Sequence, residues 1–165
     1  MRLVTWNVNS IKQRLPRLLA LIRRHEPDIV CLQETKVEDQ LFPTMELVGA
    51  GYECAMFGQR AYNGVAILSR VGLKDVRHGF DGDPIPEQSR VVSAQAGDLR
   101  VVCVYVVNGQ AVGAPAYETK LAWLDAFRAW VSRMSATGST AIRSPGSLGS
   151  FRRRRVTSGS SASTW

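Results

Sequence analysis

The stretch Asp28–Lys36, DIVCLQETK, decides the fold of this chain. It begins with a short apolar run, Ile29–Leu32, that is typical of a fully buried strand, and it changes abruptly to polar side chains at Gln33, Glu34 and Thr35. Ligands of open α/β sheets bind at the carboxyl ends of strands, so Glu34 has the position expected of a metal ligand or a catalytic group. Taken alone, however, the stretch favours a solvated acid in a turn.

The residues before this stretch predict a strand and a helix. Arg2–Asn9 alternates β-favouring side chains between two faces, which is typical of a strand. Apolar residues then recur at helical spacing. Because proline is tolerated only in the first turn of a helix, Pro16 places the start of the regular helix at about Leu15, and Pro27 ends it.

A strand, a helix and a second strand joined in this way form a parallel pair. The carboxyl ends of the two strands therefore lie at the same edge of the sheet. We expect Asn7, near the end of the first strand, and Glu34, after the second, to face one site.

The next part of the chain predicts a short helix and then a series of strands. Asp39–Val48 is the helical segment, with Phe42, Met45 and Leu47 as its buried positions. Five short, β-rich segments separated by turn residues follow, and we expect them to pair in antiparallel fashion. They are Tyr52–Phe57, Gly64–Ser69, Leu73–His78, Arg90–Ala96 and Arg100–Val106.

The composition of the chain changes after one further helix. That helix is predicted over Ala116–Met134, following a glycine-containing loop at Asn108–Ala114. Of the 34 residues from Ser132 to Trp165, ten are serine and four are glycine, and apolar periodicity disappears. We expect residues 1–131 to form the domain and residues 132–165 a disordered tail, because this composition buries too little surface to offset its ordering entropy.

The positive charge of the chain belongs mainly to this tail. The whole sequence has a net charge of +7, which favours a nucleic-acid partner. Residues 132–165 contain six arginines and no acidic residue or lysine, whereas residues 1–131 carry 15 basic and 14 acidic residues. The arginine run Arg152–Arg155 could contact phosphates without sequence preference.

Length and hydropathy fit one ordinary globular domain, with 165 residues of which 45% are hydrophobic. No apolar run is long enough to cross a bilayer, and MRLVTWN lacks the regions of a signal peptide, so we expect a cytoplasmic protein without a membrane partner. The cysteines Cys31, Cys54 and Cys103 lie in separate apolar runs without C-x-x-C spacing. We expect three buried, reduced thiols and no disulfide or zinc site.

Five motifs occur in one order along residues 1–131. They are TWNVNSIKQRL at Thr5–Leu15, PDIVCLQETK at Pro27–Lys36, YNGVAILSR at Tyr62–Arg70, YVVNGQAVG at Tyr105–Gly113 and YETKLAWLDAF at Tyr117–Phe127. Together they closely resemble exonuclease III, the bacterial apurinic/apyrimidinic endonuclease branch of the endonuclease/exonuclease/phosphatase superfamily. The resemblance implies an α/β fold, a four-layer α/β sandwich that is incomplete here: residues 1–131 would supply about one sheet with its outer helices and leave an apolar sheet face uncovered.

The resemblance also implies roles for particular residues. Glu34 matches the family's metal-ligand glutamate, and Asn7 matches the asparagine that helps to hold the metal or the scissile phosphate. Tyr105 matches the active-site tyrosine whose hydroxyl contacts the phosphate. The implied cofactor is Mg²⁺ or Mn²⁺, because a hard cation held by a carboxylate neutralises the charge that develops on phosphate oxygens.

Other positions are open to more than one interpretation. Asn63, Arg90, Asn108 and Gln110 lie in segments that resemble DNA-facing loops of the family, although solvated loop positions explain them equally well. Val107 stands where the family commonly has proline.

Aromatic and histidine side chains offer weaker candidates. For Trp6, Tyr62 and Trp123, core packing is favoured over base stacking. Neither His25 nor His78 has the sequence context of the family's catalytic histidine.

The implied function is that of a DNA-repair phosphodiesterase that cuts double-stranded DNA at abasic sites, with 3′-5′ exonuclease activity as a further reaction. The GDFN-type motif and the closing Asp-His pair of the family have no match in this sequence. Because each missing acid or base costs about 10²–10⁴ in rate, we expect this chain to have very weak activity or none. A monomer is expected, with aggregation a hazard if a sheet face is uncovered.

Three alternatives remain at this point. The first is a non-catalytic nucleic-acid-binding fragment that acts through the arginine-rich tail, and the second is hydrolysis of another phosphate ester, such as a phospholipid or an inositol phosphate. The third concerns the origin of the tail: its composition after Val131 is typical of translation in a wrong reading frame of a GC-rich gene. We hypothesise a frameshifted or truncated product, which the coding DNA can test.

Overall fold

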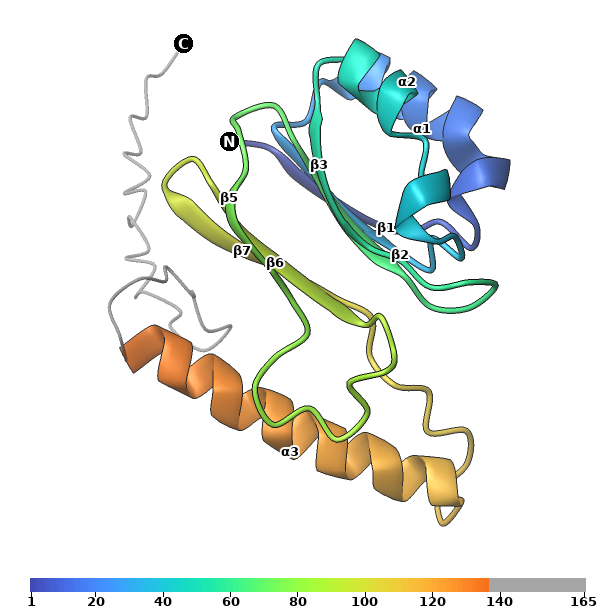
Figure 1. The fold of residues 1–165 in the computed structure, drawn as a ribbon, viewed down its shortest axis with the longest axis vertical. Helices are drawn as coiled ribbons and strands as arrows, with labels where there is room; N and C mark the ends of the chain where they lie inside the picture. Colours follow the sequence, from blue (N-terminus) through green and yellow to red (C-terminus); the bar gives the residue numbers. More distant parts are fainter. Residues whose placement is uncertain (137–165) are drawn as a thin grey trace, which may run out of the picture.

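The computed structural model describes residues 1–136, and it arranges their helices outside two packed sheets (Figure 1). The strands are β1 (Leu3–Asn7), β2 (Ile29–Gln33), β3 (Glu53–Phe57), β4 (Val65–Ser69), β5 (Lys74–His78), β6 (Val91–Ala96) and β7 (Leu99–Val104). The helices are α1 (Ile11–His25), the 3₁₀ helix η1 (Asp39–Leu41), α2 (Thr44–Gly49) and α3 (Pro115–Ala136).

The first sheet has the strand order β1-β2-β4-β3. β1 and β2 are parallel, in a register that pairs Leu3 with Ile29 and Asn7 with Gln33. β4 runs antiparallel to both of its neighbours. The predicted parallel pair is thus confirmed, and the carboxyl ends of β1 and β2 lie side by side.

The second sheet has the order β5-β6-β7 and is antiparallel throughout. The expected antiparallel pairing of the middle section is therefore confirmed. The chain contributes strands to two sheets, however, where about one sheet was expected. Periodicity identifies a strand but not the sheet it joins, and β5–β7 pair among themselves instead of extending the first sheet.

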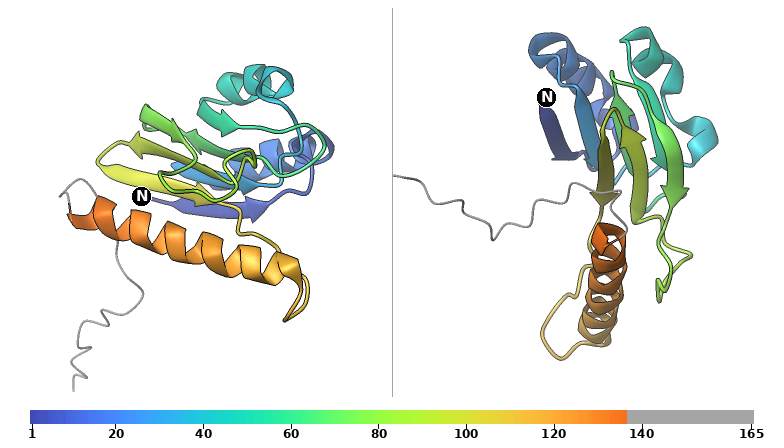
Figure 2. Two further views of the ribbon diagram at one scale, coloured as in Figure 1. Left: turned by 60° about the horizontal axis from the view of Figure 1, so that its bottom comes forward. Right: turned by 90° about the vertical axis from the view of Figure 1, so that its left-hand side faces the viewer.

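The two sheets pack face to face and share one apolar core. Strand β2 shows why its sequence is a continuous apolar run: Ile29 and Cys31 face the second sheet, while Val30 and Leu32 face the helices α1 and α2. The inter-sheet core consists of Ile29, Cys31, Ala55, Val65, Ile67, Val92, Ala94, Ala96, Val101 and Cys103. Figure 2 shows α1 and α2 on one side of the paired sheets and α3 on the other.

Helix α3 covers the outer face of the second sheet. The sequence analysis expected an apolar sheet face to be uncovered, and for this face that expectation is wrong. Trp123 is fully buried and packs in one cluster with Trp130, Val91 and Val107. The ring centroids of Phe80 and Trp123 are 5.5 Å apart in an edge-on arrangement, so Phe80 packs in the same cluster. None of the helices within residues 1–136 is both long and apolar enough to cross a membrane.

Helix α1 begins earlier than predicted, at Ile11 instead of about Leu15. The backbone amides of Ser10 and Ile11 donate to the carbonyl oxygens of Glu34 and Thr35, at 2.8 and 3.0 Å. These contacts fix the first turn from outside the helix, because helix-end amides otherwise lack partners. The proline at position 16 therefore falls inside the helix. The predicted end before Pro27 is confirmed.

Three further expectations are corrected by the structure. The segment Asp39–Val48 forms η1 and α2 with a break at Phe42 and Pro43, not one helix, and its Met45 side chain is 87% exposed. Tyr62 is 71% exposed and is not a core residue. Cys54 is half-buried, while Cys31 and Cys103 are buried as expected, and all three are free thiols.

The predicted division of the chain lies partly outside the described residues. Helix α3 continues to Ala136, past the expected domain end at Val131. The rest of the predicted tail, including the arginine run, falls in residues 137–165, outside the part that the structure describes.

Candidate functional site

Asn7 and Glu34 meet at the edge where β1 and β2 end. The parallel register places Asn7 opposite Gln33, so the next residue, Glu34, reaches the same edge. The Asn7 side-chain amide Nδ2 donates to Glu34 Oε1 at 2.7 Å. The structure thus brings together the two residues for which the sequence suggested a metal-binding role.

Lys36 completes this polar cluster, and the sequence analysis did not single it out. Its ammonium Nζ lies 3.1 Å from Glu34 Oε2 and also donates to Asn9 Oδ1. Glu34 and Lys36 both have a φ of 54°, a left-handed backbone conformation that is uncommon outside glycine. This conformation folds the chain back after β2 and turns both side chains toward one place. The sequence feature that could have indicated this ion pair is the position of Lys36, two residues after Glu34.

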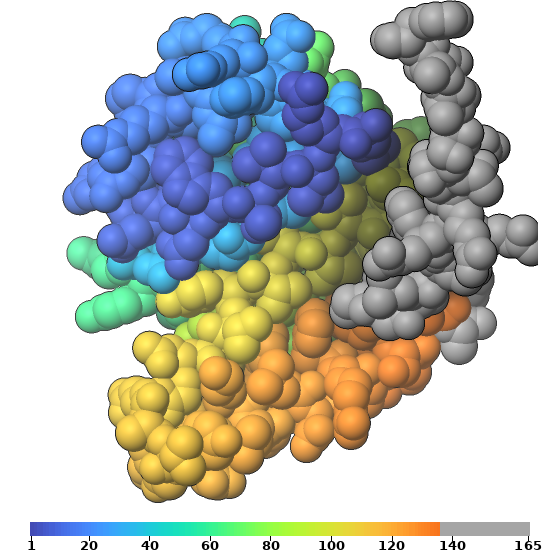
Figure 3. All heavy atoms as spheres, turned by 180° about the vertical axis from the view of Figure 1, so that it is seen from behind, coloured from blue at the N-terminus to red at the C-terminus, as the bar shows by residue number. Residues whose placement is uncertain are grey.

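Tyr105 approaches the same carboxylate from the second sheet. It follows β7 directly, and its hydroxyl is one of the groups that lower the pKa of the Glu34 carboxyl. In the space-filling view from behind, the amino-terminal segment (dark blue) and the segment after β7 (yellow) occupy one face of the molecule (Figure 3). Residues from three strand ends therefore converge on Glu34.

Arg90 supports Tyr105 and does not project into solvent. Only 9% of the residue is exposed, and its guanidinium carbon lies 5.0 Å from the centre of the Tyr105 ring. Its Nη1 donates to the carbonyl oxygens of Tyr105 and Val106, at 3.3 and 3.4 Å. These contacts give Arg90 the geometry of a positioning residue for Tyr105, although a DNA-facing loop was suggested by the sequence.

Asn63 and Gly64 hold the loop that carries Glu34. The Asn63 carbonyl accepts from Lys36 N at 3.0 Å, and the Gly64 carbonyl accepts from Thr35 N at 3.1 Å. Asn63 also donates from Nδ2 to Gln59 Oε1 at 2.8 Å. The backbone of this segment therefore fixes the position of Glu34, a role distinct from direct contact with DNA.

Asn108 and Gln110 lie on the exposed loop that follows Tyr105. Asn108 Oδ1 accepts from the Gln110 backbone amide at 2.9 Å, which closes a local turn. Within residues 1–136, neither side chain hydrogen-bonds to Asn7, Glu34 or Lys36, and both residues are exposed, so they are solvent-facing positions.

The electrostatics of the cluster favour an ionised carboxylate. The pKa of Glu34 is lowered, chiefly because Asn7 donates to it and further because the Lys36 ammonium and the Tyr105 hydroxyl lie near it. Burial and the neighbouring Glu34 carboxylate raise the pKa of Tyr105, so its hydroxyl keeps its proton. The site therefore combines a negative carboxylate, a neutral phenol and an ammonium group.

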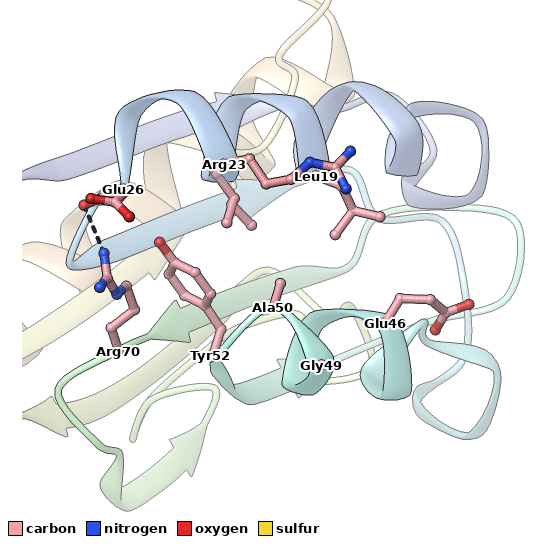
Figure 4. A pocket seen from close by; sticks show the side chains of 10 residues that line it. Leu19, Arg23, Glu26, Glu46, Gly49, Ala50, Tyr52 and Arg70 are labelled. Carbon is pink, nitrogen blue, oxygen red and sulfur yellow. Dashed lines mark hydrogen bonds between the residues drawn. The ribbon is translucent and has the colours of Figure 1, made fainter.

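A separate cavity of about 560 Å³ lies at the opposite end of the first sheet, between α1 and α2 (Figure 4). Its charged residues are two of each sign: Arg23 and Arg70, with Glu26 and Glu46. Arg70 Nη1 also donates to the Glu26 carbonyl at 3.3 Å. Because its charges balance and it lies away from the strand ends that carry Glu34, we do not place the chemistry there.

Comparison with known proteins agrees with this geometry. The sequence profile of the Endonuclease/Exonuclease/phosphatase family matches residues 4–142, which is most of the chain. This chain belongs to that family. The shared fold and the match together place the Glu34 cluster in a family of nucleases and phosphatases.

Three relatives illustrate how much of the family fold is present. Exodeoxyribonuclease III of Haemophilus influenzae is 34% identical over 73% of this chain and 45% of its own length. The 3′-5′ exonuclease of Neisseria meningitidis has a TM-score of 0.80 at 40% identity, covering 82% of this chain and 53% of its own. An AP endonuclease from Archaeoglobus fulgidus has a TM-score of 0.78 at 34% identity, covering 81% and 51%. The chain thus spans about half the length of these family members.

The first prediction concerns the support that Gly64 gives to the Glu34 loop. A Cβ at this position would lie 2.1 Å from Thr35 Oγ1, and φ is +88°. Gly64→Ala should lower the free energy of unfolding by about 3 kcal/mol, through both overpacking and backbone strain. Urea unfolding measures the change.

Gly82 provides a matched control for that substitution. Its φ is +89°, but nothing lies within 4 Å of a built Cβ. Gly82→Ala should therefore cost only the backbone term of about 1 kcal/mol. Equal losses of unfolding free energy in the two variants would show that a Cβ at position 64 does not clash with Thr35.

The second prediction concerns the pH dependence of the Asn7–Glu34 bond. The folded-state pKa of Glu34 is lowered from 4.5, so this bond stabilises the fold above that pH and loses its effect as the pH falls through the lowered pKa. Asn7→Ala should cost up to about 1 kcal/mol at neutral pH, and less in acid. The same substitution in a Glu34→Gln background should lack this pH dependence, and a persistent dependence would contradict the assignment.

Proposed function

We propose that this chain carries part of the active site of a DNA-repair phosphodiesterase that cuts double-stranded DNA at abasic sites and also removes nucleotides from 3′ ends. The observation that carries the proposal is the convergence of Asn7, Lys36 and Tyr105 on the Glu34 carboxylate. The names of the relatives, an exodeoxyribonuclease III and an AP endonuclease, support DNA as the substrate.

The donor set fits a hard divalent cation, for which Mg²⁺ or Mn²⁺ is proposed. Glu34 offers a carboxylate that is ionised at neutral pH. Asn7 donates to it from Nδ2, and the Asn7 amide oxygen, which now accepts from the Asn9 backbone amide at 3.1 Å, is a second oxygen that a cation could recruit. Mg²⁺ is typically held by one or two carboxylates, with water and substrate phosphate as its other ligands. When bound, such a cation would neutralise negative charge on the phosphate.

The protein's own groups would orient the phosphate. Tyr105 keeps its proton, so its hydroxyl can donate a hydrogen bond to a phosphate oxygen when one is near. Lys36 now balances the Glu34 charge and would be free to pair with the phosphate once a cation takes that place. Arg90 would hold the Tyr105 ring in position through its stacked guanidinium.

The described residues supply little beyond these binding groups. Within residues 1–136, no group of three or more His, Cys, Asp or Glu side chains is placed to hold a metal. No second acid or base has been identified beside Glu34 in that range. Because a positioned acid or base contributes about 10²–10⁴ in rate, we propose that cutting by this chain is very slow.

A second proposal is nucleic-acid binding through the arginine-rich tail. It rests on charge alone, since six of the 21 basic residues lie after position 131 with no acidic residue among them. Residues 137–165 lie outside the described part of the chain. Such binding would depend on salt but not on a divalent cation or on Glu34.

The third prediction separates these proposals by metal-dependent binding. A duplex with one abasic site should bind the chain about tenfold more tightly with Mg²⁺ than with a chelator, a gain that Glu34→Gln should abolish because it removes the ligand charge. Fluorescence anisotropy measures binding, and single-turnover assays should show only slow, chelator-sensitive cutting.

Glu38→Gln is the matched control, because Glu38 is an exposed glutamate four residues from Glu34. This variant should keep the full response to Mg²⁺. Binding that is equal in all three proteins and unaffected by the chelator would contradict the metal-site proposal and favour the tail. Rapid cutting that survives Glu34→Gln would contradict it as well.

A further inference from the structure

Two thiols lie in one cluster of the core between the sheets. Cys31 lies on β2 of the first sheet and Cys103 on β7 of the second, and both side chains belong to the inter-sheet core. The residues are 4% and 1% exposed, and the Cys103 sulfur lies 3.3 Å from the carbonyl oxygen of Leu32, the residue that follows Cys31. Residues distant in sequence thus place two oxidisable sulfur atoms in one part of the core.

The environment makes the two sulfur atoms chemically unequal. Gln33 Nε2 donates to Cys103 Sγ at 3.3 Å, and the Cys103 thiol donates to the Leu32 carbonyl at 3.3 Å. Donation from Cys31 and from Gln33 lowers the pKa of Cys103, whereas the contact with Cys103 and burial raise that of Cys31. Cys103 is therefore the sulfur that more readily becomes a thiolate, which is the reactive form.

The pair is reached from a groove along the open edges of both sheets. β1 and β7 are the end strands of their sheets on this side. A groove of about 450 Å³ runs between them, and Cys31, Cys103 and Gln33 are among its lining residues, with Leu3 and Arg100. A small solute can therefore approach the two sulfur atoms without unfolding of the sheets.

We propose that Cys31 and Cys103 form an oxidisable dithiol that a hydroperoxide converts to a disulfide joining the two sheets. The Cys103 thiolate attacks a peroxide oxygen, the O–O bond breaks, and a sulfenic acid forms with release of water or an alcohol. The Cys31 sulfur then attacks the sulfenic sulfur, the S–S bond forms, and water leaves. The two thiols lose two electrons and two protons, and the hydroperoxide is reduced by two electrons.

A disulfide in this position suits the architecture. Sheets that pack face to face are bridged by an inter-sheet disulfide in antibody domains, so the layer spacing of a sandwich permits one. Cys31 precedes Glu34 by three residues, and Cys103 precedes Tyr105 by two. The cross-link would tie together the two strands that carry these site residues. This inference goes beyond the proposed function and does not depend on it.

Cys54 is the matched control within the same chain. It lies on β3 and packs with the cluster under α1 and α2, on the other face of the first sheet from Cys31. Burial, with the neighbouring Glu53, raises its pKa to about 12. Its nearest hydrogen-bond partner is the Tyr52 carbonyl, so it has no thiol partner of its own.

The fourth prediction tests the pair directly in the full chain. Hydrogen peroxide should produce a peptide that links Cys31 to Cys103, with loss of two hydrogen atoms, which non-reducing peptide mapping by mass spectrometry detects. Cys54→Ala should give the same yield, whereas Cys31→Ala and Cys103→Ala should give none. Oxidation should raise Tm by about 10 °C, reversibly on reduction, because the cross-link restrains the unfolded chain.

Several results would overturn the proposal. These are a linkage that involves Cys54, disulfides between chains only, oxidation to sulfinic acid without a link, or no reaction of the wild-type chain at millimolar peroxide. Mapping of the wild-type chain decides the matter even if an alanine variant fails to fold.

Discussion

The parallel pairing of β1 with β2 is the constraint on which the rest of the structure depends. Its register sets Asn7 beside the end of β2, and the carbonyl groups of Glu34 and Thr35 then accept the first amides of α1. The same few residues therefore end a buried strand, start a helix and hold the candidate site. A shift of one residue would reverse every β1 side chain and remove Asn7 from Glu34.

Backbone geometry after β2 turns this pairing into a chemical site. Left-handed conformations at Glu34 and Lys36 aim both side chains at one point, and the Asn63–Gly64 segment fixes that loop through its carbonyl groups. Tyr105 reaches the carboxylate from the other sheet. The contact between the two sheets therefore matters for the site as well as for stability. The proposed disulfide between Cys31 on β2 and Cys103 on β7 would alter that contact chemically.

Much of this could be predicted from sequence, for identifiable reasons. The buried run of β2, the crossover helix and the Asn7–Glu34 proximity follow from periodicity and the handedness of connections. Local rules failed where distant residues decide: the start of α1 at Ile11 depends on carbonyl groups of the loop after β2, and the burial of Arg90 depends on Tyr105. Which sheet a strand joins, and that Lys36 folds back onto Glu34, are likewise tertiary outcomes that no short pattern encodes.

The central proposal is that Asn7 and Glu34, at the edge where β1 and β2 end, form a site for a divalent cation. Titration of the isotope-labelled chain with Mn²⁺, followed by paramagnetic broadening in NMR spectra, tests it most directly. At substoichiometric Mn²⁺, the account predicts that the Asn7 side-chain amide and the backbone amides of residues 34–36 broaden first, and that Mg²⁺ competes. Broadening centred elsewhere, or spread evenly over exposed acids such as Asp81 and Glu87, would contradict the account.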